Sequence, residues 1–208
     1  MINQINDNIR YIGVDDLDID LFESQYVVPE GMSYNSWVIM DEKIAIMDTA
    51  DARKGEEWQK NLVEALGGRM PDYLVCQHME PDHSANISRF AKTYPNAKIV
   101  SNSKSFVMMK QFFGAEFDAK QIVVGDGDTL SLGDKTIRFH SVPSLHWPDT
   151  IYSEIIEDQV LVTCDSFGSH YAHDGILRST VTDYEGYMRA TKYYFDNILG
   201  PFKQPHMA

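Results

Sequence analysis

Short apolar stretches bounded by Gly, Asn and Asp recur along the chain and predict runs of strands with helices between the runs. The expected strands are Ile9–Gly13, Ser36–Met40, Lys43–Asp48, Tyr73–Cys76, Lys98–Ser101, Ile122–Val124, Thr129–Leu132, Thr136–Ser141, Ile151–Ile156 and Val160–Thr163. The expected helices are Trp58–Leu66, Ala85–Phe90, Ser103–Phe113 and Tyr184–Ile198. This order favours sheet layers covered by helices, an α/β (α+β layered) class, over a strict alternation of strand and helix.

The chain shows no repeat, low-complexity tract or linker, so a single domain is expected from about residue 5 to about residue 202. With 208 residues, of which 43% are hydrophobic, it is long enough to bury a sizeable core without disulfide bonds.

Charge and composition exclude several classes of partner. The 31 Asp and Glu residues outnumber the 18 Lys and Arg residues, which leaves a formal net charge of −13. A nucleic acid or an anionic membrane is therefore not an expected partner. No apolar run approaches the roughly 20 residues that span a bilayer, and the first residues lack a signal-peptide pattern. The 2 cysteines fit a reducing compartment, so a cytoplasmic location is expected.

The first candidate for chemistry directly follows the expected strand Tyr73–Cys76 and has the pattern His78-x-Glu80-x-Asp82-His83. Alternate residues after a strand can point to one side, which would bring one imidazole and two carboxylates together. Such a mixed nitrogen and oxygen donor set suits a divalent metal. The alternative is a polar loop with capping residues and surface histidines.

Two later segments supply further candidates at strand ends. His146 lies in Ser144–Asp149, after the strand Thr136–Ser141, and Asp165 follows the strand Val160–Thr163. Rigid elements commonly present ligands at such positions, although either residue alone could belong to an ordinary turn. Taken together, the three segments follow the order of ligands in a binuclear metal site.

These motifs resemble the catalytic domain of flavodiiron proteins, the rubredoxin:oxygen and nitric-oxide reductases with a metallo-β-lactamase-like αββα sandwich. The resemblance rests on H-x-E-x-D-H, on a histidine in H-W-P-D and on an aspartate in D-x-F-G. It extends through almost the whole chain. The matching residues are His78, Glu80, Asp82, His83, His146 and Asp165.

The resemblance implies two irons and reduction of dioxygen to water or of nitric oxide to nitrous oxide. One iron would be held by His78, Glu80 and His146, and the other by Asp82, with His83 as a variable ligand. Asp165 would bridge the pair. By the same likeness, the pocket would be lined by Gln25, Tyr26, His170 and Tyr194, which otherwise are ordinary loop and helix residues.

Two departures from the family pattern lead to further expectations. A family histidine of the second iron lies beyond the position of Pro201, and His206 is not expected to replace it. The domain, residues 1–208, is therefore expected to be shortened at its C-terminal end, with an incomplete second site. No flavodoxin domain is recognised, so FMN is expected only on a separate domain or partner. Electrons would come from a rubredoxin or flavodoxin-like donor, and a homo-oligomer is expected.

Two other functions remain open from the residues. One is a zinc hydrolase of the same fold, against which Glu80 argues because those hydrolases usually carry histidine at that position. The other is a non-catalytic remnant with little or no metal. Cys76 and Cys164, which follow apolar strands, are expected to be structural. The acidic stretch Asp15–Asp20 is expected to form a solvated hairpin.

Overall fold

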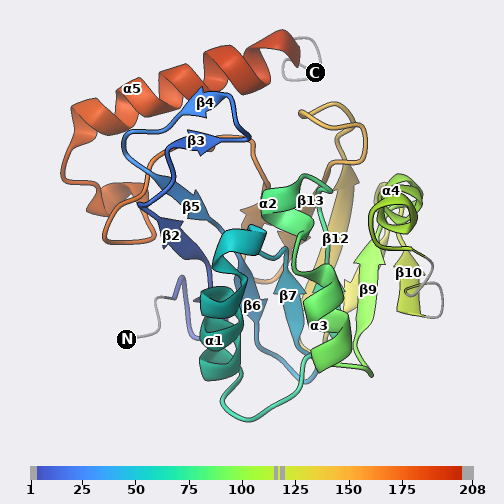
Figure 1. The fold of residues 1–208 in the computed structure, drawn as a ribbon. Coiled ribbons are helices and arrows are strands. Elements are labelled where there is room, and N and C mark those ends of the chain that lie inside the picture. Colours follow the sequence, from blue (N-terminus) through green and yellow to red (C-terminus); the bar gives the residue numbers. More distant parts are fainter. Residues whose placement is uncertain (1–3, 115–116, 118–119, 203–208) are drawn as a thin grey trace.

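The computed structural model describes residues 4–114, 117 and 120–202, and its core contains two sheets. The first sheet has six strands in the order β1-β6-β7-β8-β9-β10. Of these, β6, β7, β9 and β10 are labelled in Figure 1. These strands are β1 (Ile9–Tyr11), β6 (Trp37–Ile39), β7 (Ala45–Met47), β8 (Tyr73–Val75), β9 (Lys98–Ser101) and β10 (Gln121–Val123). The second sheet has four strands, β11 (Thr129–Ser131), β12 (Thr136–Ser141), β13 (Ile151–Ile155) and β14 (Val160–Val162).

Part of the first sheet alternates strand and helix more regularly than the sequence pattern predicted. Strands β7, β8, β9 and β10 are parallel. They are connected by α1 (Gly55–Leu66), α2 (Pro81–Ser84) with α3 (Ile87–Thr93), and α4 (Ser103–Phe113). Strands β6 and β7 form an antiparallel hairpin around Asp41, with Val38 opposite Ile46. Because β7 and β8 are parallel neighbours, their carboxyl ends lie side by side at one edge of the sheet.

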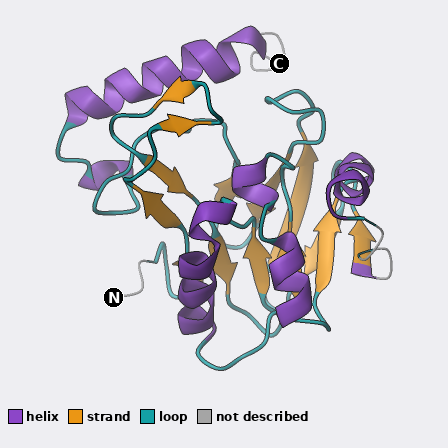
Figure 2. Ribbon diagram, viewed as in Figure 1, coloured by secondary structure: helices purple, strands orange, loops and turns teal. Residues whose placement is uncertain are grey.

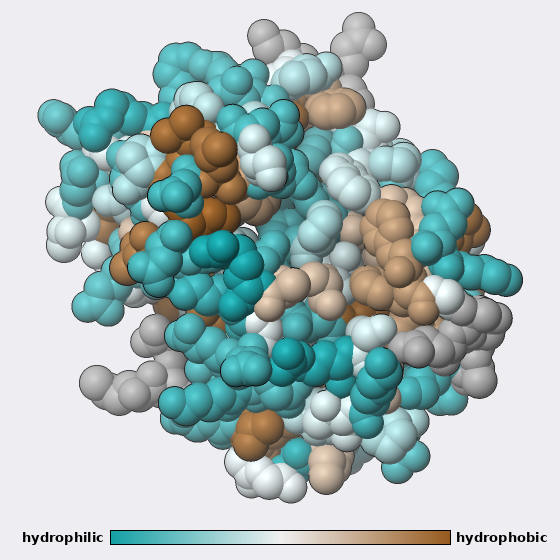
Figure 3. All heavy atoms as spheres, in the orientation of Figure 1, coloured by the Kyte–Doolittle hydropathy of each residue, from teal (hydrophilic) through white to brown (hydrophobic). Residues whose placement is uncertain are grey.

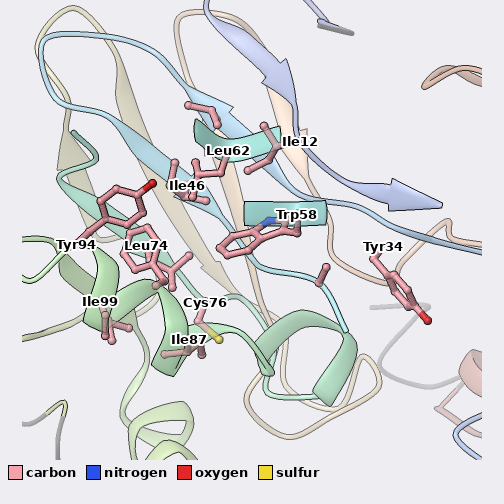
Figure 4. Packing of buried hydrophobic residues seen from close by; sticks show 14 of the residues in the cluster. Ile12, Tyr34, Ile46, Trp58, Leu62, Leu74, Cys76, Ile87, Tyr94 and Ile99 are labelled. Atoms are coloured by element: carbon pink, nitrogen blue, oxygen red, sulfur yellow. The ribbon is translucent and has the colours of Figure 1, made fainter. Parts of the chain in front are cut away.

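The middle strands β7 and β8 of the first sheet are buried on both faces, in keeping with their continuous apolar sequence. On one face, Val38, Ile46 and Leu74 pack with Trp58 and Leu62 of α1 (Figure 4). Trp58 is fully buried, and its Nε1–H donates a hydrogen bond to Ser36 Oγ at 3.0 Å. Helices α1, α2 and α3 lie over this face of the sheet (Figure 2).

The opposite face packs against the second sheet. This inner core joins residues of β7 and β8 to alternate residues of β12, including Ile137 and Phe139. The intervening Arg138 and His140 point outward, where both contact the Glu154 carboxylate.

The N-terminal region contains structure that the pattern did not predict. Strand β2 (Val14–Asp16) pairs with β5 (Met32–Tyr34), and β3 (Leu21–Phe22) pairs with β4 (Tyr26–Val27). The expectation of a solvated hairpin at Asp15–Asp20 is wrong for Asp16, which is fully buried. Its carboxylate accepts a hydrogen bond from Arg53 Nε at 3.0 Å, and Lys54 Nζ lies 3.7 Å away. Partners remote in sequence thus permit this burial.

The expected helices differ from the structure in two places. The expected helix Ala85–Phe90 begins in the turn after α2 and otherwise overlaps only the first part of α3. The last helix is α5 (Tyr184–Tyr194), which continues as a π-helical segment over Phe195–Leu199. Asp183 caps the N-terminus of α5, where its side chain accepts a hydrogen bond from the Gly186 N–H. Helix α5 lies across the β3–β4 hairpin, where Tyr194 packs with Tyr26 (Figure 1).

The face of the molecule in Figure 3 is mostly hydrophilic, with exposed apolar side chains over the β3–β4 hairpin. Leu21 and Val27 of this hairpin are 46% and 59% exposed. Within the described ranges, no helix combines the length and apolar character needed to cross a bilayer.

Candidate metal centre

Three segments of the chain bring the six candidate ligands together at one edge of the two sheets. His78 and Glu80 lie in the loop after β8, and Asp82 and His83 lie in α2. His146 is in the loop between β12 and β13, and Asp165 follows β14. The candidate residues are largely buried, which limits the access of water to their donor atoms.

The first group consists of His78, Glu80, His146 and Asp165, each offering one donor atom within 4.8 Å of the others. Glu80 Oε2 lies 2.9 Å from His78 Nε2 and 2.8 Å from His146 Nε2. Asp165 Oδ2 lies 3.1 Å from each of the same two nitrogens. Two imidazoles and two carboxylates thus converge on one point.

The second group consists of Asp82, His83 and Asp165 and shares Asp165 with the first. Asp165 Oδ1 lies 2.9 Å from His83 Nε2, while Asp165 Oδ2 belongs to the first group. Asp82 Oδ2 lies 3.6 Å from His83 Nε2. The two oxygens of Asp165 therefore face two different donor groups, as a bridging carboxylate would.

Asp48 is part of this arrangement, although the sequence interpretation did not single it out. Its Oδ2 lies 3.1 Å from His83 Nδ1, and its Oδ1 accepts a hydrogen bond from the Gln77 N–H at 2.7 Å. Cys164 Sγ lies 3.7 and 3.9 Å from the two ring nitrogens of His83. Because both carboxylate oxygens of Asp48 already have protein partners, Asp48 is suited to orienting His83. The sequence feature that could have identified Asp48 is its position at the end of an apolar strand, a position that Asp165 shares.

The outward nitrogen of His78 also has protein partners. Its Nδ1 lies 3.3 Å from Thr150 Oγ1 and 3.9 Å from Asp149 Oδ1. These contacts leave Nε2 directed toward Glu80 and Asp165. A histidine whose other nitrogen is held in this way presents a fixed lone pair to a metal.

In the metal-free protein, the pKa values of the histidines and carboxylates are shifted by two opposing effects, burial and the nearby opposite charges. Burial alone would lower the pKa of His78, but the charge of Asp165 and contacts with Asp165 and Glu80 raise it to about 9. Burial likewise acts to lower the pKa of His146, but Asp165 and Glu80 raise it to about 10. Burial acts to raise the pKa of Asp165, yet His83 and His78 hold it well below its ordinary value.

The pKa values of Asp82 and Glu23 are raised because several carboxylates lie close together at the site. Burial, together with Glu80 and Asp165, raises the pKa of Asp82 to about 7 despite the charge of His83. Burial and the neighbouring Glu80 raise the pKa of Glu23, in the turn of the β3–β4 hairpin, to about 8. A bound cation would relieve this repulsion.

The donor atoms are arranged to bind a metal ion rather than to hydrogen-bond with one another. Among the described residues, Asp165 Oδ2 and Asp82 Oδ1 are buried without a hydrogen-bond partner. Asp165 Oδ2 lacks a well-directed bond although two imidazole nitrogens lie at 3.1 Å. Atoms that converge at short distance without pairing are typical of a site that holds an ion, because buried polar atoms are otherwise satisfied. Imidazole and carboxylate donors suit iron, zinc or manganese.

A cavity of about 340 Å³ opens next to these groups and is lined by residues that include Glu80, Asp165, His170 and Tyr194. Of the other expected pocket residues, Tyr26 contacts the His170 ring but is not among the lining residues. Gln25 is exposed and also absent from the lining. His206 lies outside the described residues. Cys76 is buried, with Sγ 3.2 Å from the His78 carbonyl oxygen, in keeping with a structural role.

Comparison with known proteins connects this geometry to a family. A family model described as ODP family beta lactamase matches residues 32–203. The flavo-diiron protein FprA2 of Clostridium acetobutylicum is 31% identical over 202 residues, which are 96% of this chain and 50% of that protein. The anaerobic nitric oxide reductase flavorubredoxin of Pectobacterium atrosepticum is 31% identical over 207 residues, which are 98% of this chain and 40% of that protein.

Solved structures show the same fold. The flavodiiron protein from Giardia intestinalis is 31% identical and superposes with a TM-score of 0.92 over 99% of this chain and 49% of its own. The rubredoxin oxygen:oxidoreductase from Desulfovibrio gigas is 28% identical, with a TM-score of 0.93 over 100% of this chain and 51% of its own. The expected metallo-β-lactamase-like fold is thereby confirmed. The chain spans about half the length of these relatives.

Proposed function

Because this chain belongs to the ODP family of beta-lactamase-type domains, we propose that it is a non-haem di-iron oxidoreductase domain. It reduces dioxygen to water or nitric oxide to nitrous oxide with electrons from an external donor. The names of its relatives support this class, since they include a nitric oxide reductase and a rubredoxin oxygen:oxidoreductase. The resemblance to flavodiiron proteins expected from the motifs is confirmed by the same relatives.

The observation that carries the proposal is the position of Glu80. Its buried carboxylate lies within 2.9 Å of both His78 Nε2 and His146 Nε2. Zinc hydrolases of this fold usually carry histidine at this place, so the carboxylate makes the donor set harder. A harder, more anionic set favours a metal that cycles between ferrous and ferric states.

In this proposal, His78, Glu80 and His146 hold one iron, and Asp82 holds the other with His83. Asp165, which belongs to both donor groups, would contribute to holding both irons. When bound, the pair would supply one-electron redox chemistry to a diatomic substrate. The family resemblance and the two donor groups sharing Asp165 support this assignment.

The surrounding residues position the ligands and exclude bulk water. Thr150 and Asp48 hold the outward nitrogens of His78 and His83, so both rings present Nε2 to the centre. The donor groups themselves are largely buried, which lowers the effective dielectric and strengthens the interaction of these carboxylates with positive charge. His170 and Tyr194 line the cavity at which a small substrate would enter.

We infer a flavin- or iron-containing donor of the rubredoxin or flavodoxin-like kind, with FMN on a separate domain or partner. The names flavorubredoxin and rubredoxin oxygen:oxidoreductase support that class of donor. The free thiols of Cys76 and Cys164 are compatible with a reducing, cytoplasmic location.

Anaerobic reconstitution with ferrous iron tests the proposal. We expect two irons per chain by elemental analysis, and consumption of dioxygen or nitric oxide when reduced flavodoxin or rubredoxin is added. NADH alone should not support rapid turnover. A Glu80→His variant serves as the comparison, and its occupancy should shift toward zinc when both metals are offered in equal amounts.

Two outcomes would contradict the proposal in different ways. Iron-loaded protein that consumes neither gas, together with zinc-loaded protein that hydrolyses a lactam, thioester or phosphodiester, would indicate the hydrolase. Substoichiometric binding of both metals would indicate a non-catalytic remnant.

A further inference from the structure

A third group of possible metal ligands lies on the far side of the His83 ring from Asp165. It consists of Asp48, His83 and Cys164, whose donor atoms all lie within 4.8 Å of one another. Asp48 directly follows β7, His83 lies in α2, and Cys164 comes shortly after β14. This group shares only His83 with the two groups already described, so it is a separate set of donors.

The two nitrogens of His83 face different groups. Nε2 lies 2.9 Å from Asp165 Oδ1. Nδ1 lies 3.1 Å from Asp48 Oδ2 and 3.7 Å from Cys164 Sγ, which is 3.9 Å from Nε2. A cation bound at Nδ1 would therefore have a nitrogen, an oxygen and a sulfur atom within reach.

The distances between these three donors match those around a tetrahedral zinc ion. With bonds of about 2.1 Å to nitrogen and oxygen and about 2.3 Å to sulfur, a nitrogen ligand lies about 3.4 Å from an oxygen ligand and about 3.6 Å from a sulfur ligand. The corresponding distances from His83 Nδ1 are 3.1 Å to Asp48 and 3.7 Å to Cys164. Only small side-chain adjustments would bring all three donors onto one ion.

Gln77 places a further polar atom beside this group. Its side chain is fully buried, and within the described parts of the chain its Oε1 has no hydrogen-bond partner. The Nε2 of the same amide lies 3.3 Å from Asp48 Oδ2. Because buried polar atoms are almost always paired, this oxygen points to a ligand at the group. Gln77, Asp48, His83 and Cys164 all line the cavity of about 340 Å³, which gives an ion access to them.

The sulfur atom determines which metal the group prefers. A thiolate is a soft ligand, and together with imidazole and carboxylate it forms a donor set typical of zinc. The groups that contain His78 and Asp82 offer only nitrogen and oxygen. A thiol binds metal as the thiolate, so occupation of this group releases the Cys164 proton to solvent.

We propose that Asp48, His83 and Cys164 form a binding site for a thiophilic divalent cation of the zinc class, with Gln77 Oε1 as a further oxygen beside it. Without such an ion, Asp48 orients His83 as described above. Cys164 thereby has a role beyond the packing expected from its sequence.

This site and the second iron exclude each other. A neutral imidazole has one lone pair for a metal, and a His83 ring bound through Nδ1 keeps its proton on Nε2, facing Asp165. A zinc-class ion would therefore remove His83 from the second iron. The exclusion rests on the proposed function, whereas the binding of the ion does not.

Titration of the metal-free protein with cadmium, a soft analogue of zinc, tests the binding. The ultraviolet charge-transfer absorption of a cadmium–thiolate bond reports only on cadmium bound to sulfur. We expect one thiolate-bound cadmium per chain in the wild type and loss of the absorption in Cys164→Ser. Cys76→Ser, which changes the other of the 2 cysteines, is the matched control and should keep it. An unchanged absorption in Cys164→Ser would overturn the proposal.

Two carboxylate variants locate the ion. Asp48→Asn should weaken the thiolate-bound cadmium by at least about tenfold, since loss of an indirect contact alone can cost this much. Asp82→Asn should keep the absorption, because Asp82 belongs only to the group that faces Nε2. Loss of the absorption in Asp82→Asn with retention in Asp48→Asn would assign Cys164 to the second iron group and overturn the proposal.

Anomalous diffraction from a cadmium-soaked crystal of the wild type gives the position without any variant. We expect a peak at bonding distance from both Cys164 Sγ and His83 Nδ1. Peaks confined to the groups around Asp165 would overturn the proposal.

Iron-loaded protein tests the exclusion. One equivalent of cadmium should lower the iron content from two toward one per chain in the wild type but not in Cys164→Ser. Two irons retained together with a full cadmium–thiolate absorption would overturn the exclusion. Wild-type protein that binds no iron would instead contradict the proposed function, and the cadmium titration would still decide the site at Cys164.

Discussion

Asp48 Oδ2 lies 3.1 Å from Nδ1 of His83, so this carboxylate holds one nitrogen of a ring whose other nitrogen faces the candidate metal centre. The backbone N–H of Gln77 donates to the same carboxyl group at 2.7 Å, which fixes Asp48 in turn. Asp48, which directly follows β7, thus orients His83 beside the centre.

Asp48→Asn should weaken the second metal selectively. The amide can still accept from the Gln77 N–H, but it no longer fixes His83 as a negative charge does. We expect a loss of about 10- to 100-fold in affinity for the second metal, with the first little affected. Metal titration followed by elemental analysis measures both steps. Asp196→Asn, an exposed carboxylate paired with Lys192, is the control. Equal retention of both metals in Asp48→Asn would contradict the assignment.

Asp165→Asn should weaken both metals at once, because each oxygen of Asp165 faces one of the two donor groups. The change preserves the shape of the side chain but replaces an anionic donor with a neutral, poorer one. We expect the affinity at both sites to fall by at least about tenfold, given that loss of an indirect contact alone can cost this much. Elemental analysis after dialysis measures the loss. Full metal retention would show that Asp165 does not bridge.

His146→Ala should remove a donor from the first group only. His146 Nε2 lies 2.8 Å from Glu80 Oε2, whereas His140 lies on the outer face of β12 against Glu154. His140→Ala is therefore a matched control that removes a histidine away from the centre. We expect His146→Ala to lose about one metal per chain while His140→Ala keeps both. Removing a residue that binds the metal should cost at least as much affinity as removing a residue that only orients such a ligand. Anomalous diffraction at the iron edge would locate the remaining metal.

Stability of the metal-free protein should fall as pH rises above neutrality. The pKa values of His78 and His146 are raised to about 9 and 10, so their stabilising contribution is complete below their ordinary pKa of about 6.5. It is lost as pH rises through the folded-state values. The lowered pKa of Glu80 and Asp165 acts oppositely, and their contribution is lost in strong acid.

Metal should reverse this dependence near neutral pH. Binding requires neutral imidazoles, so stabilisation by metal should grow as pH rises from 6 to 8. Thermal unfolding of metal-free and metal-loaded protein across this range measures both trends. Parallel curves for the two forms would contradict metal binding by His78 and His146.

We also expect the chain to associate into a homodimer or a larger assembly. Phe167 is 79% exposed next to Asp165, and the cavity-lining Leu161 and Leu177 are 48% and 45% exposed. A specific interface would bury more than about 1,000 Å². Light scattering at micromolar concentration measures the mass, and Phe167→Ser should weaken association if this face takes part. A single species at 23.7 kDa would contradict the expectation.

The sequence by itself determined elements with a clear local period. The expected segments Lys98–Ser101, Ser103–Phe113 and Thr136–Ser141 coincide with β9, α4 and β12. Apolar residues alternate along a strand and recur every three to four residues along a helix, so the sequence of the element itself is enough to predict it. The six candidate ligands were also recognisable, because His78, Glu80, Asp82 and His83 lie close together and the other two lie in specific motifs.

Tertiary structure alone decided the pairing of β2 with β5, the burial of Asp16 and the place of Asp48. Asp16 is buried because Arg53 and Lys54 approach it from a distant part of the chain. Asp48 contacts His83 only because β7 and β8 are parallel neighbours whose carboxyl ends meet. Such contacts join residues far apart in sequence, and their atoms acquire a role only when the folded sheets set their distance and direction.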